Sequence, residues 1–124
     1  MRYMCLVYLD EEKMVAFAKD PLAIGAFERE VVAYDRELND KGVLVMGSPL
    51  RRVREAVTIR VRDGRMSATD GPFAETKEQL GGFILIDVRD LNEAIELAGR
   101  SPLARIGSIE VRPVGHPGWP ESTA

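Results

Sequence analysis

The chain has 124 residues, of which 45% are hydrophobic and 30% are charged, and its formal net charge is −3. This length supports one buried core, and this composition excludes an intrinsically disordered chain. No apolar run approaches the roughly 20 residues of a membrane helix, and an acidic chain lacks the basic field that attracts nucleic acid or anionic lipid. We therefore expect a soluble single domain with no membrane and no nucleic-acid partner.

The first predicted element is a strand over residues 2–9, RYMCLVYL, because both of its alternating sets of side chains are apolar. A strand of this kind is covered on both faces, which places it in the centre of a sheet. Cys5, the single cysteine, lies within this strand, so it has no internal disulfide partner and is expected to be a small core residue. Acidic residues follow the strand without a signal-peptide cleavage site, which favours a cytoplasmic protein.

A long amphipathic helix is predicted over residues 21–41. Asp20 is a typical N-cap residue and Pro21 suits the first helical position, while the Lys41-Gly42 pair marks the end. The segment between the first strand and this helix, EEKMVAFAK, is expected to be a loop or a short helical turn. Five apolar residues recur at helical spacing, namely Ile24, Phe27, Val31, Tyr34 and Leu38.

A second strand begins at residues 43–46, and we expect Gly47-Ser48-Pro49 to interrupt it. A β-hairpin follows, because AVTIRVRDGRMSAT alternates apolar and polar residues around Asp63-Gly64, a dipeptide typical of two-residue hairpin turns. The polar face of the hairpin is expected to be exposed to solvent. The two faces carry Val57, Ile59 and Val61 on one side and Thr58, Arg60 and Arg62 on the other.

The C-terminal half predicts a strand, a short helix and a last strand. GGFILIDV, residues 81–88, is apolar on both alternations over its first part, so it is expected to be a second central strand. Asp90 and Glu93 form a capping-box pattern before a helix that Gly99 ends, and residues 104–114 contain the last strand. Residues 115–124 are a Pro/Gly-rich tail beyond a single domain of residues 1–114.

In chain order these elements predict an α+β fold, the ferredoxin-like split βαβ scheme with a β-hairpin inserted before the third core strand. Two amphipathic helices cover only one face of such a sheet. Met4, Leu6 and Tyr8, with alternate residues of FILI, nevertheless make the second face apolar. We therefore expect a homodimer in which two sheets face each other as a dimeric α+β barrel with a cleft.

The stretch TDGPFAETKEQLGGF, residues 69–83, combines turn-forming residues with charged side chains. Two interpretations of Asp70 remain open, a purely structural turn and a carboxylate held rigidly at a cleft for acid/base chemistry. Glu75 and Lys77 belong either to a solvated loop or to a ligand-binding site. Gly81-Gly82 is expected to allow a bulge where the chain enters the central strand.

Tyr8 and Arg51 are two further candidate ligand-binding residues. Tyr8, like Tyr34, offers its hydroxyl to a pocket or packs in the core with the hydroxyl at the rim. Arg51 belongs to a basic cluster that is either an anion site or a solvated arginine face. The cluster consists of Arg51, Arg52, Arg54, Arg60, Arg62 and Arg65.

Metal and cofactor sites are not predicted. One cysteine and one histidine, His116 in the tail, provide no metal-ligand spacing, and no phosphate-binding or dinucleotide motif is present. We expect no metal and no cofactor.

The motif TDGPFAETKEQLGGF, together with MRYMCLVY, the VRDGR hairpin and SPLARIGSIEVRPV, resembles the DGPF subgroup of the YCII-related superfamily. The resemblance implies a dimeric ferredoxin-like α+β barrel with an active site in the cleft, because related YCII proteins pair an aspartate with a histidine. Asp70 matches that aspartate, whereas the only histidine of this chain is His116 in the tail. The resemblance further implies a link to alternative sigma factors of the extracytoplasmic-function class.

Two functions therefore remain open. The one we favour is a binding or accessory protein that holds an unidentified small polar molecule in a dimer cleft and serves sigma-factor regulation. The other is a cofactor-independent isomerase, lyase or hydrolase, with Asp70 as acid/base and Lys77 as its electrostatic partner. The expected ligand-binding residues are Glu75, Lys77, Tyr8 and Arg51.

Overall fold

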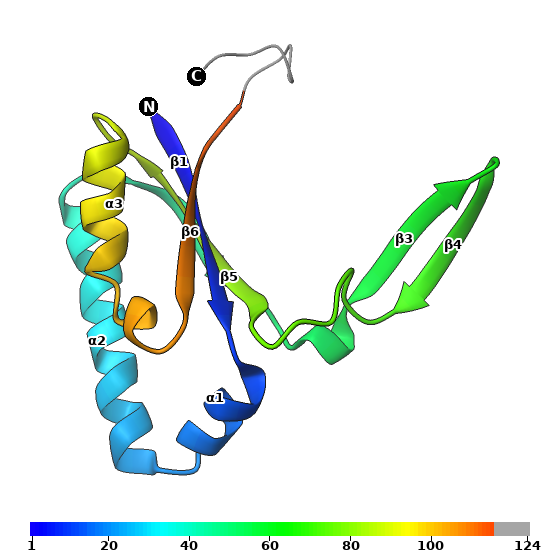
Figure 1. Ribbon diagram of the computed structural model, residues 1–124. Helices are drawn as coiled ribbons and strands as arrows, with labels where there is room; N and C mark the ends of the chain where they lie inside the picture. Colours follow the sequence, from blue (N-terminus) through cyan, green and yellow to red (C-terminus); the bar gives the residue numbers. More distant parts are fainter. Residues whose placement is uncertain (116–124) are drawn as a thin grey trace.

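The computed structural model describes residues 1–115, and Figure 1 shows a sheet with helices on one side and a hairpin projecting away on the other. Four antiparallel strands form the main sheet in the order β2-β5-β1-β6. This order is the predicted ferredoxin-like one, with the two doubly apolar strands in the centre. The strands are β1 (Arg2–Leu9), β2 (Leu44–Pro49), β5 (Gln79–Asp87) and β6 (Ser108–Pro113).

Three α-helices connect the strands, α1 (Glu11–Phe17), α2 (Pro21–Asp40) and α3 (Leu91–Gly99). Each begins after an aspartate whose carboxylate accepts backbone N–H groups of the first turn, which stabilises the helix end. The three caps are Asp10, Asp20 and Asp90. The segment expected to be a loop or helical turn is therefore the capped helix α1. None of the described helices is long and apolar enough to cross a membrane.

Helices α2 and α3 cover one face of the main sheet and bury its side chains. The hydroxyl of Tyr34 donates a hydrogen bond to the Leu97 carbonyl oxygen at 2.6 Å, which ties α2 to α3. Cys5 is buried in this core as expected, and burial raises the pKa of its thiol to about 11. The core also contains Tyr3, Leu38, Ile86, Val88, Ala94 and Ala98.

The other face of the main sheet is not covered by the helices. Met4, Leu6 and Tyr8 alternate with the buried residues of β1, and the strand register places Met4 beside Leu85 and Leu6 beside Phe83. All five side chains are only partly buried. We call this surface the open sheet face, and its apolar character is the one predicted. The homodimer expected to cover it stays a prediction.

Strands β3 (Val57–Arg62) and β4 (Arg65–Asp70) form a separate two-stranded sheet, which we call the arm. Asp63 and Gly64 connect the strands with φ angles of 53° and 73°, the positive values that a type I′ hairpin turn requires. The predicted hairpin is confirmed. The arm leaves the main sheet on the side away from the helices (Figure 1).

The prediction that Gly47-Ser48-Pro49 interrupts the second strand is wrong. Strand β2 continues to Pro49, and Gly47 pairs with Ile84 of β5. A Cβ atom on Gly47 would lie 3.1 Å from the Phe83 carbonyl oxygen, so glycine permits the close approach of the two strands. β2 lies at the edge of the sheet, where the missing N–H of a proline is tolerated. The predicted tail falls mostly outside the described residues, as does His116.

Candidate functional site

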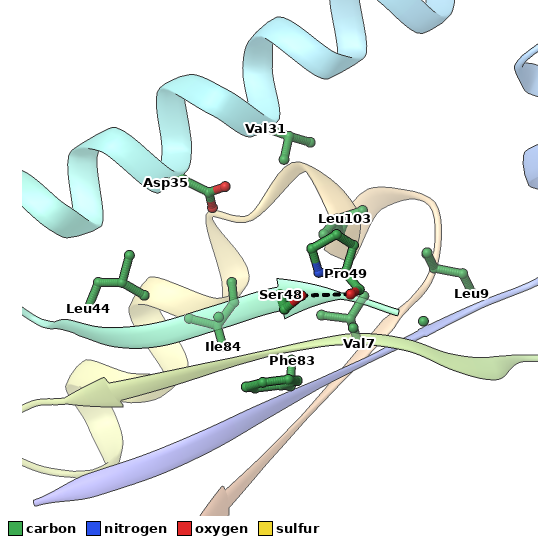
Figure 2. A pocket seen from close by; sticks show the side chains of 13 residues that line it. Val7, Leu9, Val31, Asp35, Leu44, Ser48, Pro49, Phe83, Ile84 and Leu103 are labelled. Carbon is green, nitrogen blue, oxygen red and sulfur yellow. Dashed lines mark hydrogen bonds between the residues drawn. The ribbon is translucent and has the colours of Figure 1, made fainter. Parts of the chain in front are cut away.

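A cavity of about 360 Å³ lies between α2 and the main sheet, on the face that the helices cover (Figure 2). We call it the helix-side cavity. Val31 projects into it from α2, Ile84 from β5, and Leu103 from the 3-10 helix η2 (Pro102–Arg105). Asp35 is the one ionisable side chain among its described lining residues. The site is therefore an apolar cavity with a single carboxylate.

Glycines leave room for this cavity at the floor of the sheet. Gly47, Gly81 and Gly82 all line it and contribute no side-chain volume. A Cβ atom on Gly82 would lie 3.1 Å from the Ser48 carbonyl oxygen and 3.3 Å from Pro49 Cα, so glycine here lets β2 and β5 approach closely without a tight contact. Two glycines of the LGG segment thus help to shape the cavity.

The predicted bulge at Gly81-Gly82 is present. The register between β1 and β5 shifts after Val7, which pairs with Gly82, while the next residue, Tyr8, pairs with Leu80. Gly81 is therefore the extra residue of the bulge. The bulge lies at the cavity, where a departure from regular pairing changes the direction of the following side chains.

Asp35 is partly desolvated at the edge of this cavity. Burial raises the pKa of its carboxyl group, because desolvation penalises the charge. Within residues 1–115 no hydrogen bond or ion pair to this carboxylate is found. The residue as a whole is exposed, so the carboxylate lies at the rim of the cavity and is only partly desolvated. Such a group is available to accept a hydrogen bond or a proton from a ligand.

Ser48 provides a second polar group. Its hydroxyl donates to the Pro49 carbonyl oxygen at 2.8 Å, as Figure 2 shows, so its oxygen remains able to accept a hydrogen bond.

Sequence reasoning did not select Asp35, although a signal was present. Asp35 follows Val31 by one helical turn and precedes Leu38 by three residues, so it lies at the border of the inward stripe of α2. A carboxylate within an apolar stripe is the informative exception in an amphipathic helix.

A second, wider hollow of about 740 Å³ lies where the arm joins the main sheet, and we call it the arm-side groove. Tyr8 and Arg51, two of the predicted site residues, both line it. Their polar groups already have partners: the Tyr8 hydroxyl donates to Glu110 Oε1 at 3.3 Å, and Arg51 Nε contacts both Glu55 oxygens at 2.9 Å. Phe73 also lines the groove.

Asp70 is the last residue of β4, and its side chain is exposed. The turn after it is held by other groups, because the Gly71 N–H donates to the Ala56 carbonyl oxygen at 2.7 Å and the Thr58 hydroxyl donates to the Gly71 carbonyl oxygen at 2.9 Å. No hydrogen bond to the Asp70 carboxylate is found in the described part of the chain. Asp70 lines neither of the two hollows, and its catalytic role stays a prediction.

Glu75 and Lys77 lie exposed in the segment that leads to β5 and also line neither hollow. Their neighbour Glu78 accepts a hydrogen bond from the Ser108 hydroxyl at 2.7 Å. Of the five predicted site residues, the structure therefore places only Tyr8 and Arg51 in one hollow. Residues 1–115 contain no cluster of three His, Cys, Asp or Glu side chains that is placed to share a metal ion.

The family model for the YCII-related domain matches residues 1–116. The chain belongs to the YCII-related family. An uncharacterized protein of Rhizobium meliloti (strain 1021) is 39% identical to this YCII-family chain over 116 residues, which is 92% of each protein. The match supports the family and leaves the narrower DGPF subgroup as a prediction.

One solved structure has the same fold at low sequence identity. It is the 5-chloro-2-hydroxyhydroquinone dehydrochlorinase TftG from Burkholderia phenoliruptrix AC1100, in complex with 2,5-dihydroxybenzoquinone. The superposition has a TM-score of 0.51 and covers 94% of this chain and 95% of TftG, with 14% sequence identity. At this identity the likeness concerns the fold alone.

Proposed function

We propose that the helix-side cavity of this YCII-family protein binds a small, largely apolar molecule that donates a hydrogen bond to Asp35. The carrying observation is a carboxylate without a partner in residues 1–115, at the rim of an otherwise apolar cavity. Pockets of roughly 300–1,000 Å³ with apolar walls and few polar groups are typical of small-molecule sites. The cavity has a volume of about 360 Å³, which suits a ligand at the small end of this range.

The charge of the cavity restricts the ligand. Asp35 is the single ionisable group of the lining, so an anionic ligand would meet repulsion without a compensating cation. A neutral or cationic molecule with a hydroxyl or amine donor is favoured. The complex of TftG with 2,5-dihydroxybenzoquinone supports a hydroxylated ring as the first compound to test.

Hydroquinone is a suitable probe, because it is a neutral ring with two hydroxyl donors. Isothermal calorimetry should detect its binding to the wild type. Val31→Phe fills the cavity and should weaken binding at least about tenfold, whereas Val32→Phe, an equal change on the exposed side of α2, should bind like the wild type. Equal affinities in the two variants would exclude the helix-side cavity.

The role of Asp35 requires a second comparison. Asp35→Asn removes the charge and should weaken hydroquinone binding about threefold to tenfold, because charge-assisted hydrogen bonds are stronger than neutral ones. Para-dimethoxybenzene has the same ring without donors, so its weaker binding should not change in Asp35→Asn. If both compounds respond alike, the carboxylate does not recognise a donor.

A second candidate function is cofactor-independent proton transfer at the same carboxylate. The raised pKa of Asp35 moves the group toward neutral pH, where it more readily takes and returns a proton. Acid/base catalysis by Asp70 is the competing prediction from the sequence. An exchange experiment with hydroxycyclohexanone in deuterated water distinguishes Asp35 from Asp70 as the base. A base that removes a carbon-bound proton allows deuterium to replace it, and mass spectrometry measures that deuterium. Loss of incorporation in only one of Asp35→Asn and Asp70→Asn identifies the base, and no incorporation by the wild type excludes this second function.

The accessory role in regulation by an extracytoplasmic-function sigma factor is a proposal from the family resemblance. Deletion of the gene should change transcription from the promoters of that sigma factor. Unchanged transcription in the deletion strain would contradict the link. The expected cytoplasmic location is tested by fractionation of the same cells.

A further inference from the structure

Two glutamates of α2 have cationic partners within the chain. Glu30 forms an ion pair with Arg105 of η2. Glu37 forms ion pairs with both Lys41 and Arg100. The basic residues that reach α2 from its C-terminal end, from η2 and from the end of α3 are therefore already paired with carboxylates other than Asp35.

Asp35 lies between these two glutamates in the sequence, yet in the part of the chain that the structure describes no ion pair to its carboxylate is found. The pKa values reflect this difference. The hydrogen bond to Lys41 lowers the pKa of the Glu37 carboxyl group, whereas burial raises the pKa of the Asp35 carboxyl group. A positive charge beside Asp35 would offset this partial desolvation.

The two arginines of α2 itself lie on the other side of the helix. Arg29 and Arg36 line a hollow on the exposed side of α2, together with Val32, and neither is among the described residues that line the helix-side cavity. Arg36 follows Asp35 directly, so a rotation of about 100° around the helix axis separates the two positions. The described chain thus leaves the cation for Asp35 to a ligand.

The walls of the helix-side cavity restrict the rest of that ligand. Figure 2 shows Asp35 beside a space that is otherwise bounded by aliphatic side chains. A charged group at the rim keeps part of its hydration, while an apolar body gains from leaving water. The ligand should therefore carry its charge at one end. The aliphatic walls consist of Val7, Leu9, Val31, Leu44, Ile84 and Leu103.

We propose that the ligand of the helix-side cavity is a protonated primary amine with a small apolar body. The inference rests on the proposed function and narrows the ligand to a cation. The ammonium group donates a hydrogen bond to the Asp35 carboxylate at the rim, and the apolar body lies between α2 and the main sheet. A carboxylate on the same molecule would be repelled by Asp35, so free amino acids are poor ligands.

Isothermal calorimetry with three compounds of similar shape tests the preference for a cation. At neutral pH phenethylamine is a cation, phenethyl alcohol is neutral and hydrocinnamate is an anion. The amine should bind to the wild type about threefold to tenfold more tightly than the alcohol, because a charge-assisted hydrogen bond is stronger than a neutral one. Hydrocinnamate should bind most weakly. Equal affinities for the amine and the alcohol would overturn the inference.

A pair of variants tests whether the preference comes from Asp35. Asp35→Asn should abolish the preference for the amine over the alcohol. Glu28→Gln removes the same charge from the exposed side of α2, where Glu28 lines the outer hollow, and should retain the preference. An equal preference in the two variants would show that the Asp35 carboxylate does not contact the ammonium group, and the inference would be wrong.

Failure of this inference and failure of the proposed function give different results. If the amine and the alcohol bind equally and Val31→Phe weakens both, the cavity binds small molecules without a preference for cations, and only the inference is wrong. If none of the three compounds binds to the wild type, or if Val31→Phe binds them as the wild type does, the helix-side cavity is not their site and both proposals are wrong.

Discussion

At the residue scale, Asp35 is an exposed carboxylate whose inner side borders an apolar cavity. Desolvation raises its pKa, and in the described chain no hydrogen bond or ion pair compensates for the lost hydration. Departures from otherwise consistent patterning are expected at functional sites. The Asp35 carboxylate lines an apolar cavity, so it is the first group to test for contact with a ligand.

Asp35→Asn should stabilise the protein at neutral pH. The pKa of Asp35 is raised in the folded state, so ionising this carboxyl group costs more in the folded chain than in the unfolded one. The free energy of unfolding is therefore not reduced by Asp35 below the unfolded-state pKa, and it falls as the pH rises from there through the folded-state pKa. Thermal melts should show a higher Tm for the variant at pH 7. The difference should vanish below about pH 3, where Asp35 is protonated in both states. A variant that is less stable than the wild type at pH 7 would mean that the carboxylate has a favourable partner.

At the element scale, the contact between α2 and α3 combines apolar packing with a buried hydrogen bond. Tyr34 is buried at this contact, burial raises the pKa of its hydroxyl, and the hydroxyl donates to the Leu97 carbonyl oxygen at 2.6 Å. Tyr34 is one of the five apolar positions of the predicted stripe, so its burial was expected. Its partner on another helix was not, because periodicity describes one element at a time.

Tyr34→Phe should reduce the free energy of unfolding by about 1 kcal/mol, because it leaves the Leu97 carbonyl oxygen without this donor. Tyr3→Phe is a matched control in the same core, since the Tyr3 hydroxyl has only a long contact of 3.8 Å to Met1 Sδ. Urea denaturation measures both. Equal losses in the two variants would indicate that the Tyr34 hydrogen bond contributes nothing specific.

The edge strand β2 shows the limit of local signals for an element. Gly47-Ser48-Pro49 is a typical breaker sequence, yet all three residues pair with β5. Strand β2 tolerates these residues because it lies at the edge of the sheet and because Gly82 lies opposite Pro49. Neither fact is contained in the three residues themselves.

At the scale of the whole molecule, residues 51–70 have more basic than acidic side chains, with six arginines and three acidic residues, although the chain as a whole is acidic. If two copies associate as the predicted homodimer, attraction between residues 51–70 of one copy and the acidic remainder of the other contributes to association. Raising NaCl from about 0.05 M to about 0.5 M shortens the screening length and should weaken the dimer several-fold. Sedimentation equilibrium at both concentrations measures the change. Tighter association at high salt would show that apolar contact acts without help from charge.

The candidate site was only partly accessible from the sequence. The glycine pair of TDGPFAETKEQLGGF was expected to form a bulge, and the structure has that bulge at the helix-side cavity. The charged residues of the same motif attracted the catalytic prediction, but Asp70, Glu75 and Lys77 line neither hollow. Their roles stay predictions. The acidic residue that lines the helix-side cavity is Asp35.

The sequence by itself determined the order of the elements, the two central strands, the hairpin and the single-sided cover of the sheet. These features follow from local signals: side-chain periodicity, helix caps and turn residues act within a few positions of the chain. Only the tertiary structure decided which carboxylate faces a cavity. A cavity is space left between distant segments, here α2, the strands around Gly81 and Gly82, and the helix η2, so the residues beside an aspartate in the chain do not reveal what lies across from it.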